Sequence, residues 1–151
     1  MNILIVEDEI EKANSVIRFI EQAFPTYKLT LKESFNSAFR EIKVNYHQYD
    51  LILLDMTMTT FDKSTDEDGG TPQILAGCNI LESMKLRRIL TPVVVVSMYE
   101  SFDGKKMNEL HNELLVKYPF NYKGHVKFAY NKRDWQIELS NYIKLKENGA
   151  S

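Results

Sequence analysis

The sequence predicts an α/β fold, a doubly wound parallel sheet of five strands with helices on both faces. Short apolar runs at residues 3–6, 51–54 and 92–96 are typical of strands that are buried on both faces of a parallel sheet. Stretches with helical spacing of apolar residues separate these runs. Strict alternation of strands and helices, joined by right-handed crossovers, gives a three-layer α/β sandwich.

The first part of the chain supplies three strands and two helices. Pro25 has no backbone N–H to donate and should end the first helix. Ser34 can accept hydrogen bonds from the first turn of the second helix and is a plausible N-cap. The predicted elements are a strand at 2–6, a helix at 10–24, a strand at 27–32, a helix from 35 and a strand at 51–54.

An irregular stretch at residues 57–74 follows the third strand. Its Gly, Pro, Ser, Thr and Asp content is loop composition, and it exceeds the ~2–6 residues usual for such a connection. Helical spacing places Leu86, Leu115 and Ile137 on the apolar faces of the last three helices. The predicted elements are a helix from 76 that ends before Thr91, a strand at 92–96, a helix at 104–118, a strand at 124–127 and a helix from 134.

Length and composition indicate one globular domain. The chain has 151 residues, of which 44% are hydrophobic, so it can bury a sizeable core. The formal net charge of −2 gives no reason to expect a nucleic-acid or anionic-membrane partner. Cys78 is the only cysteine, which excludes a disulfide framework. We expect a cytoplasmic protein without a membrane span, with residues 1–146 as the domain and 147–151 as a tail.

Polar residues of different types follow the apolar runs. Glu7 and Asp8 follow the first run, Asp55 follows the third, Ser97 follows the fourth and Lys127 follows the last. The carboxyl ends of neighbouring parallel strands converge on one crevice, where ligands bind. Carboxylates, a hydroxyl and an ammonium would then face one another. This set can hold a hard cation and accept a phosphoryl group on an aspartate.

Four segments in order resemble the receiver domain of response regulators in two-component phosphorelays. Residues 1–9 resemble the opening strand with its acidic pair, and residues 50–56 the strand with the phosphoacceptor. Residues 76–83 resemble the start of the third helix, and residues 91–98 the strand that ends in Ser or Thr. The resemblance spans nearly the whole chain and implies the flavodoxin-like (βα)5 fold with strand order 2-1-3-4-5.

The resemblance also implies a magnesium site. Asp55 would be the phosphoacceptor and would coordinate Mg²⁺ directly together with Asp8. Glu7 would act mainly through water, and the carbonyl of Thr57 would supply a further oxygen. Mg²⁺ takes oxygen ligands and keeps several waters, so this small set is sufficient.

Two further residues would contact the phosphoryl group. By the resemblance, Ser97 would hydrogen-bond one phosphoryl oxygen and the ammonium of Lys127 would pair with another. Receivers usually carry Lys-Pro at the end of the fifth strand, whereas Phe128 follows the lysine here. Lys123 and Lys132 therefore stay open as alternatives to Lys127.

Two other features depart from the family pattern. The inserted loop carries Asp62, Asp66, Glu67 and Asp68, which we expect to be solvated; it can be a lid, a docking surface or a tolerated insertion. The family couples its Ser or Thr to an aromatic residue of the fifth strand. Near that position this chain has His125, and Tyr99 and Tyr130 are alternatives.

The resemblance implies a phosphoacceptor and not an enzyme, apart from autophosphorylation and autodephosphorylation at Asp55. Its partners would be a sensor histidine kinase or phosphotransfer protein and an unknown effector protein. The chain ends near the fifth helix, so we expect no output module. The alternative is a pseudo-receiver that binds proteins without being phosphorylated. A dehalogenase-type hydrolase is disfavoured because Thr57 stands where its second aspartate should be.

Overall fold

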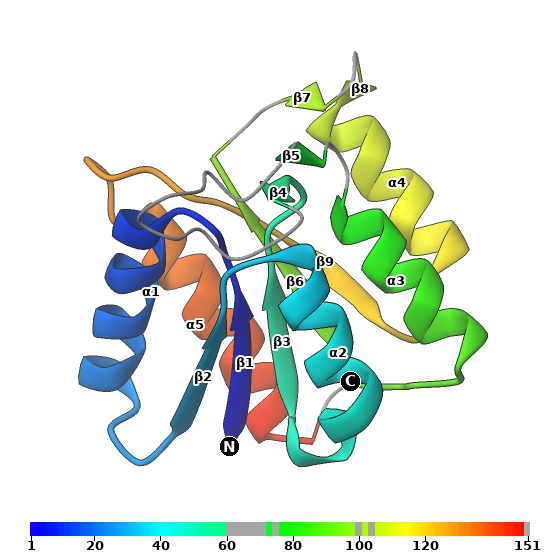
Figure 1. The fold of residues 1–151 in the computed structure, drawn as a ribbon. Coiled ribbons are helices and arrows are strands. Elements are labelled where there is room, and N and C mark those ends of the chain that lie inside the picture. Colours follow the sequence, from blue (N-terminus) through cyan, green and yellow to red (C-terminus); the bar gives the residue numbers. More distant parts are fainter. Residues whose placement is uncertain (60–71, 74–75, 99–100, 103–104, 150–151) are drawn as a thin grey trace, which may run out of the picture.

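The fold is a five-stranded parallel sheet between two helical layers, as a computed structural model shows for residues 1–59, 72–73, 76–98, 101–102 and 105–149 (Figure 1). The sheet has the order β2-β1-β3-β6-β9, and every neighbouring pair is parallel. In chain order these strands are first to fifth, so the predicted order 2-1-3-4-5 is confirmed. The strands are β1 (Asn2–Val6), β2 (Lys28–Lys32), β3 (Leu51–Leu54), β6 (Val93–Ser97) and β9 (Tyr122–Lys127).

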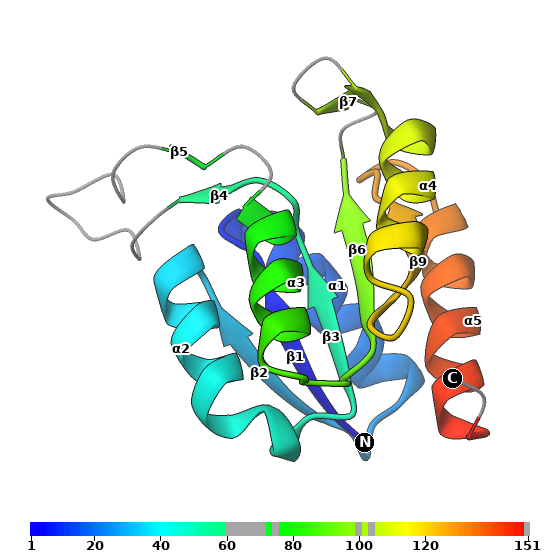
Figure 2. The same ribbon diagram turned by 90° about the vertical axis from the view of Figure 1, so that its right-hand side faces the viewer.

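The helices lie on both faces of the sheet. Helices α1 and α5 cover one face, and α2, α3 and α4 cover the other (Figures 1 and 2). None of the helices in the described part of the chain is both long and apolar enough to cross a membrane. The helices are α1 (Ile10–Ala23), α2 (Phe35–Asn45), α3 (Ala76–Leu86), α4 (Met107–Lys117) and α5 (Asp134–Glu147), with a short 3₁₀ helix at Tyr46–Gln48.

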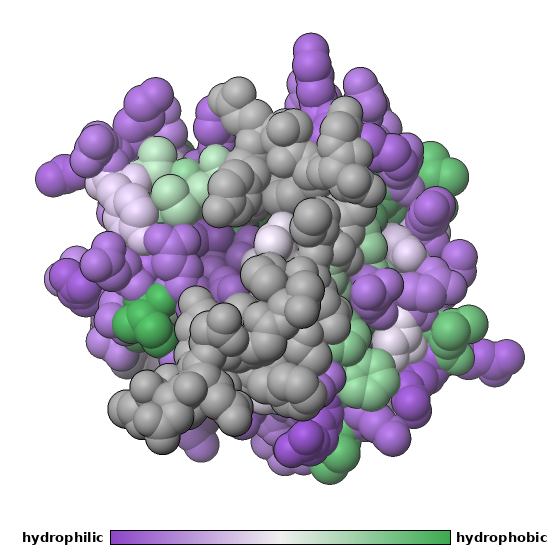
Figure 3. Space-filling model, turned by 45° about the horizontal axis from the view of Figure 1, so that its top comes forward, coloured by the Kyte–Doolittle hydropathy of each residue, from purple (hydrophilic) through white to green (hydrophobic). Residues whose placement is uncertain are grey.

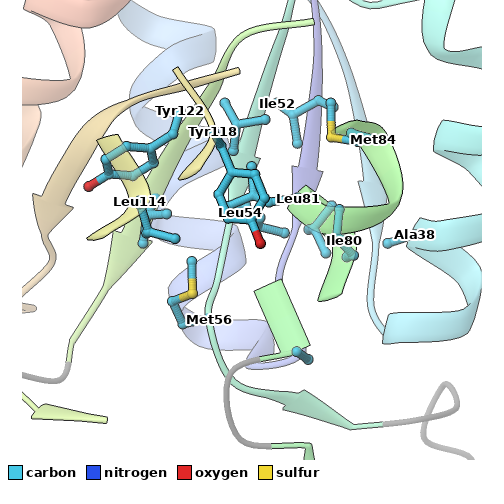
Figure 4. Close-up of a cluster of buried hydrophobic side chains, with 14 of the residues drawn as sticks. Ala38, Ile52, Leu54, Met56, Ile80, Leu81, Met84, Leu114, Tyr118 and Tyr122 are labelled. Carbon is cyan, nitrogen blue, oxygen red and sulfur yellow. The ribbon is translucent and has the colours of Figure 1, made fainter. Parts of the chain in front are cut away.

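Alternating strand residues point into two separate hydrophobic cores. Leu54 packs with α2, α3 and α4, and Figure 4 shows this core with Met56 below it and Tyr118 and Tyr122 beside it. Leu53 points to the other face and packs with α1 and α5. All four residues of β3 are buried, as expected for a central strand with helices on both sides.

Local signals set the ends of the first two helices as predicted. Helix α1 ends at Ala23, and Phe24 is its C-cap, directly before Pro25. Ser34 caps α2: its hydroxyl accepts a hydrogen bond from the backbone N–H of Ser37, and the Ser37 side chain accepts one from the backbone N–H of Ser34. This reciprocal capping box satisfies two of the donors that a helix start leaves unpaired.

Two short antiparallel ribbons were not predicted. Strand β4 (Met58–Thr59) pairs with β5 (Pro72–Gln73), so the two ends of the insertion lie side by side. Strand β7 (Ser101–Phe102) pairs with β8 (Lys105–Lys106), and α4 consequently begins at Met107 instead of residue 104. Two-residue strands are too short to produce an alternating pattern in the sequence. The acidic residues predicted to be solvated at 62–68 lie outside the described residues.

Three apolar residues that we assigned to buried helix faces are exposed. The exposed fractions are 75% for Leu86, 42% for Leu115 and 64% for Ile137. Leu86 and Ile137 each follow a buried residue by two positions, which is ~200° around a helix, and Leu115 follows one by a single position, ~100°. These positions therefore turn away from the sheet, and the assignment of all three was wrong.

Close packing against Gly124 gives a first prediction. A Cβ atom at this position would lie 2.0 Å from the hydroxyl oxygen and 2.6 Å from Cζ of Tyr142 in α5. We expect Gly124→Ala to lower the free energy of unfolding by about 2–3 kcal/mol, because the ring must move in a packed interface and because alanine is strained at the φ of +156° found here. Urea denaturation measures this loss.

The double variant Gly124→Ala/Tyr142→Leu separates this clash from other effects of the substitution. Leucine has no atoms where the tyrosine ring ends, so the double variant should lose less stability than the two single losses added together. Additive losses would show that the clash is not the cause.

Candidate functional site

The sheet register gathers the predicted polar residues at one edge. The backbone N–H of Asp55 donates to the carbonyl of Val6, so Asp55 lies next to the acidic residues that follow β1. Ser97 and Lys127 are register partners at the ends of β6 and β9. In Figure 3, which brings this end of the molecule forward, most side chains around its rim are hydrophilic.

Three carboxylates form the centre of the site. Glu7 and Asp55 are only 4% and 5% exposed, whereas Asp8 is partly exposed. Each offers an oxygen, and these oxygens lie within 4.8 Å of one another. The β1 and β3 strand ends bring these residues together as the sequence predicted. Thr57 is partly buried and follows Asp55 by two residues.

The sequence analysis missed Lys12, which lies inside the same cluster. Its side chain is buried, and its ammonium Nζ lies 2.5 Å from Oε1 of Glu7 and 3.5 Å from Oδ1 of Asp55. The ammonium also donates a hydrogen bond of 2.7 Å to the backbone carbonyl of Val96 in β6. One lysine of α1 therefore contacts groups from three neighbouring strands.

Burial and charge oppose each other in this cluster. Burial raises the pKa of Glu7 to about 8, against the lowering effect of the Lys12 ammonium. Burial likewise raises the pKa of Asp55, and Lys12 again lowers it in part. Burial on its own lowers the pKa of Lys12, but Asp55 and Glu7 raise it by more, so its net pKa lies above the ordinary value. The Lys12 ammonium therefore stays charged, whereas burial disfavours the ionised forms of Glu7 and Asp55.

Two signals in the sequence could have identified Lys12. It precedes Val16 by four residues, so it shares the buried face of α1 with that valine. It also stands in the first turn of the helix, where the dipole disfavours a positive charge. A lysine at such a position indicates pairing with nearby carboxylates and not exposure to solvent.

The carboxylates fit a magnesium ion. Oδ1 of Asp55 is buried and accepts no hydrogen bond from the described residues; with the Lys12 ammonium 3.5 Å away, it retains room for a further ligand. Oxygens on opposite sides of an octahedral Mg²⁺ lie about 4.2 Å apart, twice the ~2.1 Å bond length. The observed spread of 4.8 Å needs only a small contraction. With all groups ionised, three carboxylates and one ammonium also leave an excess of two negative charges.

The comparisons with known proteins agree with this architecture. No protein-family model matches the chain. It is 33% identical over 144 residues to the Detocs response regulatory protein DtcB of Enterobacter cloacae. The aligned region covers 92% of this chain and 95% of the relative. The chain belongs to the response-regulator family.

Solved structures show the same fold for this receiver domain. The receiver domain of a Francisella response regulator superposes with a TM-score of 0.61 at 20% identity and covers 96% of this chain and 94% of its own. A CheY-like receiver domain protein from Methanospirillum hungatei gives 0.60 at 18% identity, with 99% and 98% covered. At these identities the likeness concerns the fold alone.

The receiver places its three candidate lysines at different points. Lys127 ends β9 opposite Ser97. Lys123 lies at the other end of the strand, beside a register shift between Val93 and Val94. Lys132 lines a cavity of about 330 Å³ together with residues of α1 and α5, apart from the carboxylates. Position therefore favours Lys127, and its role stays a prediction.

A lysine comparison tests that role. We expect Lys127→Ala to permit phosphoryl uptake at Asp55 but to reduce the structural response, because the ammonium stabilises product charge without being the nucleophile. Chemical-shift changes on addition of beryllofluoride, a phosphoryl analogue, measure the response. Lys132→Ala serves as the control. A larger defect in the control would assign the pocket lysine to position 132.

A glycine brings α3 of the receiver against the phosphoacceptor strand. The backbone N–H of Gly77 donates to the carbonyl of Met56 at 3.0 Å. A Cβ atom at this position would lie 3.0 Å from the carbonyl oxygen of Asp55 and 3.0 Å from the Met56 side chain. The absence of a side chain at residue 77 therefore lets the helix start touch the backbone that carries Asp55.

Of the three residues considered for coupling to Ser97, the structure describes His125 and Tyr130. His125 is half-buried, and its ring contacts that of His111 in α4 at a centroid distance of 5.2 Å. Burial and His111 lower the pKa of His125. The hydroxyl of Tyr130 donates to Glu9 at 2.9 Å. Tyr99 lies outside the described residues.

Proposed function

We propose that this receiver accepts a phosphoryl group on Asp55 in a two-component phosphorelay, in a reaction that needs Mg²⁺. The observation that carries the proposal is the buried Asp55 carboxylate within a cluster of three acids. Its Oδ1 accepts no hydrogen bond from the described residues and forms a 3.5 Å ion pair with Lys12, so it can still act as a nucleophile or metal ligand. The family relationship supports the same function.

The transfer uses few groups of the chain. A carboxylate oxygen of Asp55 attacks the phosphorus atom of the donor, a new O–P bond forms, and the bond from phosphorus to the leaving group breaks. Bound Mg²⁺ would be held by Asp8 and Asp55, with Glu7 and the Thr57 carbonyl nearby, and would reduce the repulsion between carboxylate and phosphoryl oxygens. Ser97 and Lys127 would then contact the phosphoryl oxygens.

The proposed partners are proteins. A sensor histidine kinase or phosphotransfer protein would supply the phosphoryl group in the cytoplasm, and an effector protein would recognise the modified domain. The face formed by α4, β9 and α5 is the expected contact surface for the effector, because β9 pairs with the strand that ends in Ser97. Such a response is a shift between two surface states and not an enzymatic turnover of a second substrate.

One observation favours the alternative, a pseudo-receiver that binds partners without modification. The ammonium of Lys12 already neutralises part of the charge on Glu7 and Asp55, and a permanent ion pair could replace the metal. The excess of acidic groups over ammonium groups in the cluster argues against this alternative, since it leaves charge for a divalent ion to compensate.

Mass spectrometry of the intact protein distinguishes the two functions. The chain should gain the mass of one phosphoryl group after incubation with acetyl phosphate and Mg²⁺, and it should gain none when the metal is chelated. Beryllofluoride should bind under the same metal conditions. No modification and no beryllofluoride binding at any Mg²⁺ concentration would establish the pseudo-receiver.

A further inference from the structure

We propose that Lys12 is a resident counter-cation that competes with Mg²⁺ for the acidic cluster and so sets the metal affinity of the receiver. The inference rests on the proposed function, because the competing ion is the metal that phosphorylation would require. It adds a residue to the site that neither the motifs nor the family pattern assigned. Its basis is the position of one buried ammonium among the oxygens that a metal would use.

Oxygen atoms of three different residues surround the Lys12 ammonium. Its Nζ donates a hydrogen bond to the carbonyl of Val96 at 2.7 Å and lies 2.5 Å from Oε1 of Glu7 and 3.5 Å from Oδ1 of Asp55 as an ion-pair partner. The side chain is only 2% exposed, so water contributes little to its solvation. A buried ammonium is tolerated only where it is paired, and here the acids provide that pairing.

The position of Lys12 in α1 argues that the acids hold it there. It is the third residue of the helix, where the positive end of the dipole repels an ammonium. It occupies a buried-face position that an apolar side chain could fill without desolvating a charge. Both the repulsion by the helix dipole and the cost of desolvation are therefore offset by the pairing of Lys12 with the acids in the absence of metal.

Mg²⁺ and the ammonium would share the same oxygens. An ion bound about 2.1 Å from Oδ1 of Asp55 would lie within about 5.6 Å of Nζ, given the 3.5 Å between those two atoms. A divalent and a univalent cation this close repel strongly in a site with little water. Metal binding must therefore displace the Lys12 side chain or proceed against its charge, and either route weakens the affinity.

Titration of Lys12→Met with MgCl₂ tests the competition. Methionine keeps most of the length of the side chain and removes the charge, so Mg²⁺ should bind at least ~10-fold more tightly than to the wild type. Calorimetry or amide chemical shifts measure the affinity. Lys28→Met is the matched control, because Lys28 is exposed at the opposite end of the sheet and its loss changes the net charge equally.

Thermal unfolding gives a second readout that does not depend on phosphorylation. Without metal, Lys12→Met should be less stable than the wild type, because the two buried carboxylates of Glu7 and Asp55 lose their counter-charge. Saturating Mg²⁺ should raise its unfolding temperature by more than it raises that of the wild type. Lys12→Arg keeps the charge and should keep the weak affinity of the wild type.

A second pair of variants covers the case in which Lys12→Met does not fold. Glu7→Gln and Glu7→Gln/Lys12→Met both carry one buried carboxylate fewer, and the double variant should bind Mg²⁺ about 10-fold more tightly than the single one. Equal affinities within the pair would overturn the competition but leave the proposed function standing. Absence of Mg²⁺ binding in every variant, together with failed phosphoryl uptake, would overturn both.

Discussion

Asp55→Ala should abolish phosphoryl uptake completely, while the wild-type chain is modified once per molecule. The reason is that, in the part of the chain that the structure describes, no other residue places a carboxylate oxygen at the same point of the cluster: Asp8 is more exposed, and Glu7 lies 2.5 Å from the Lys12 ammonium. The removed carboxylate is buried and its pKa is raised, so the substitution should not unfold the domain. Intact-mass measurement after incubation with acetyl phosphate and Mg²⁺ gives the result.

The controls separate the identity of the acceptor from a general loss of acid. Asp134→Asn removes an exposed carboxylate at the start of α5 and should be modified at the wild-type rate. Circular dichroism should show that Asp55→Ala keeps its folded spectrum. Modification of a folded Asp55→Ala protein would move the acceptor to another residue and contradict the assignment.

Asp8→Ala should have the second largest effect, because it removes a predicted direct ligand of the metal. We expect Mg²⁺ affinity to fall by at least ~10-fold and phosphoryl uptake at limiting Mg²⁺ to fall by about 100-fold. The substitution also removes one of the two excess negative charges, so the Lys12 ammonium would oppose the metal more effectively. A higher Mg²⁺ concentration should restore part of the rate.

The matched control for this effect is Glu11→Ala. Glu11 is an exposed acid in the first turn of α1, only three residues along the chain. Its removal changes the net charge by the same amount but takes no ligand from the cluster, so uptake should be unchanged. If both substitutions slowed uptake equally, the effect of Asp8 would be long-range electrostatics and not coordination.

The strands and the site were predictable because their signals are local. The apolar runs before Asp55 and Ser97 mark buried strands, and parallel pairing necessarily brings the residues at their ends together. Ser34 was recognisable as a cap because capping depends on residues three positions apart. The β4–β5 and β7–β8 ribbons were not predictable, since their two-residue strands leave no periodicity.

Lys12 shows where such reasoning stops. Helical spacing identifies the face on which Lys12 lies, but the usual assumption that lysine is exposed overrides this signal. Its partners Asp55 and Val96 lie 43 and 84 positions away in the sequence, so only the folded sheet brings them within reach. Periodicity can therefore place Lys12 on the buried face, but only the tertiary structure shows which groups pair with its charge.

The packing of strand β6 determines which surfaces of the domain a structural change at Ser97 can affect. Val93 and Val95 belong to the core beneath α3 and α4, whereas Val94 and Val96 belong to the core beneath α1 and α5. A small shift of this one strand therefore reaches both outer surfaces at once through close-packed side chains. Two proteins on opposite sides of the domain could read the same event simultaneously, and neither would need to touch the pocket in which it began.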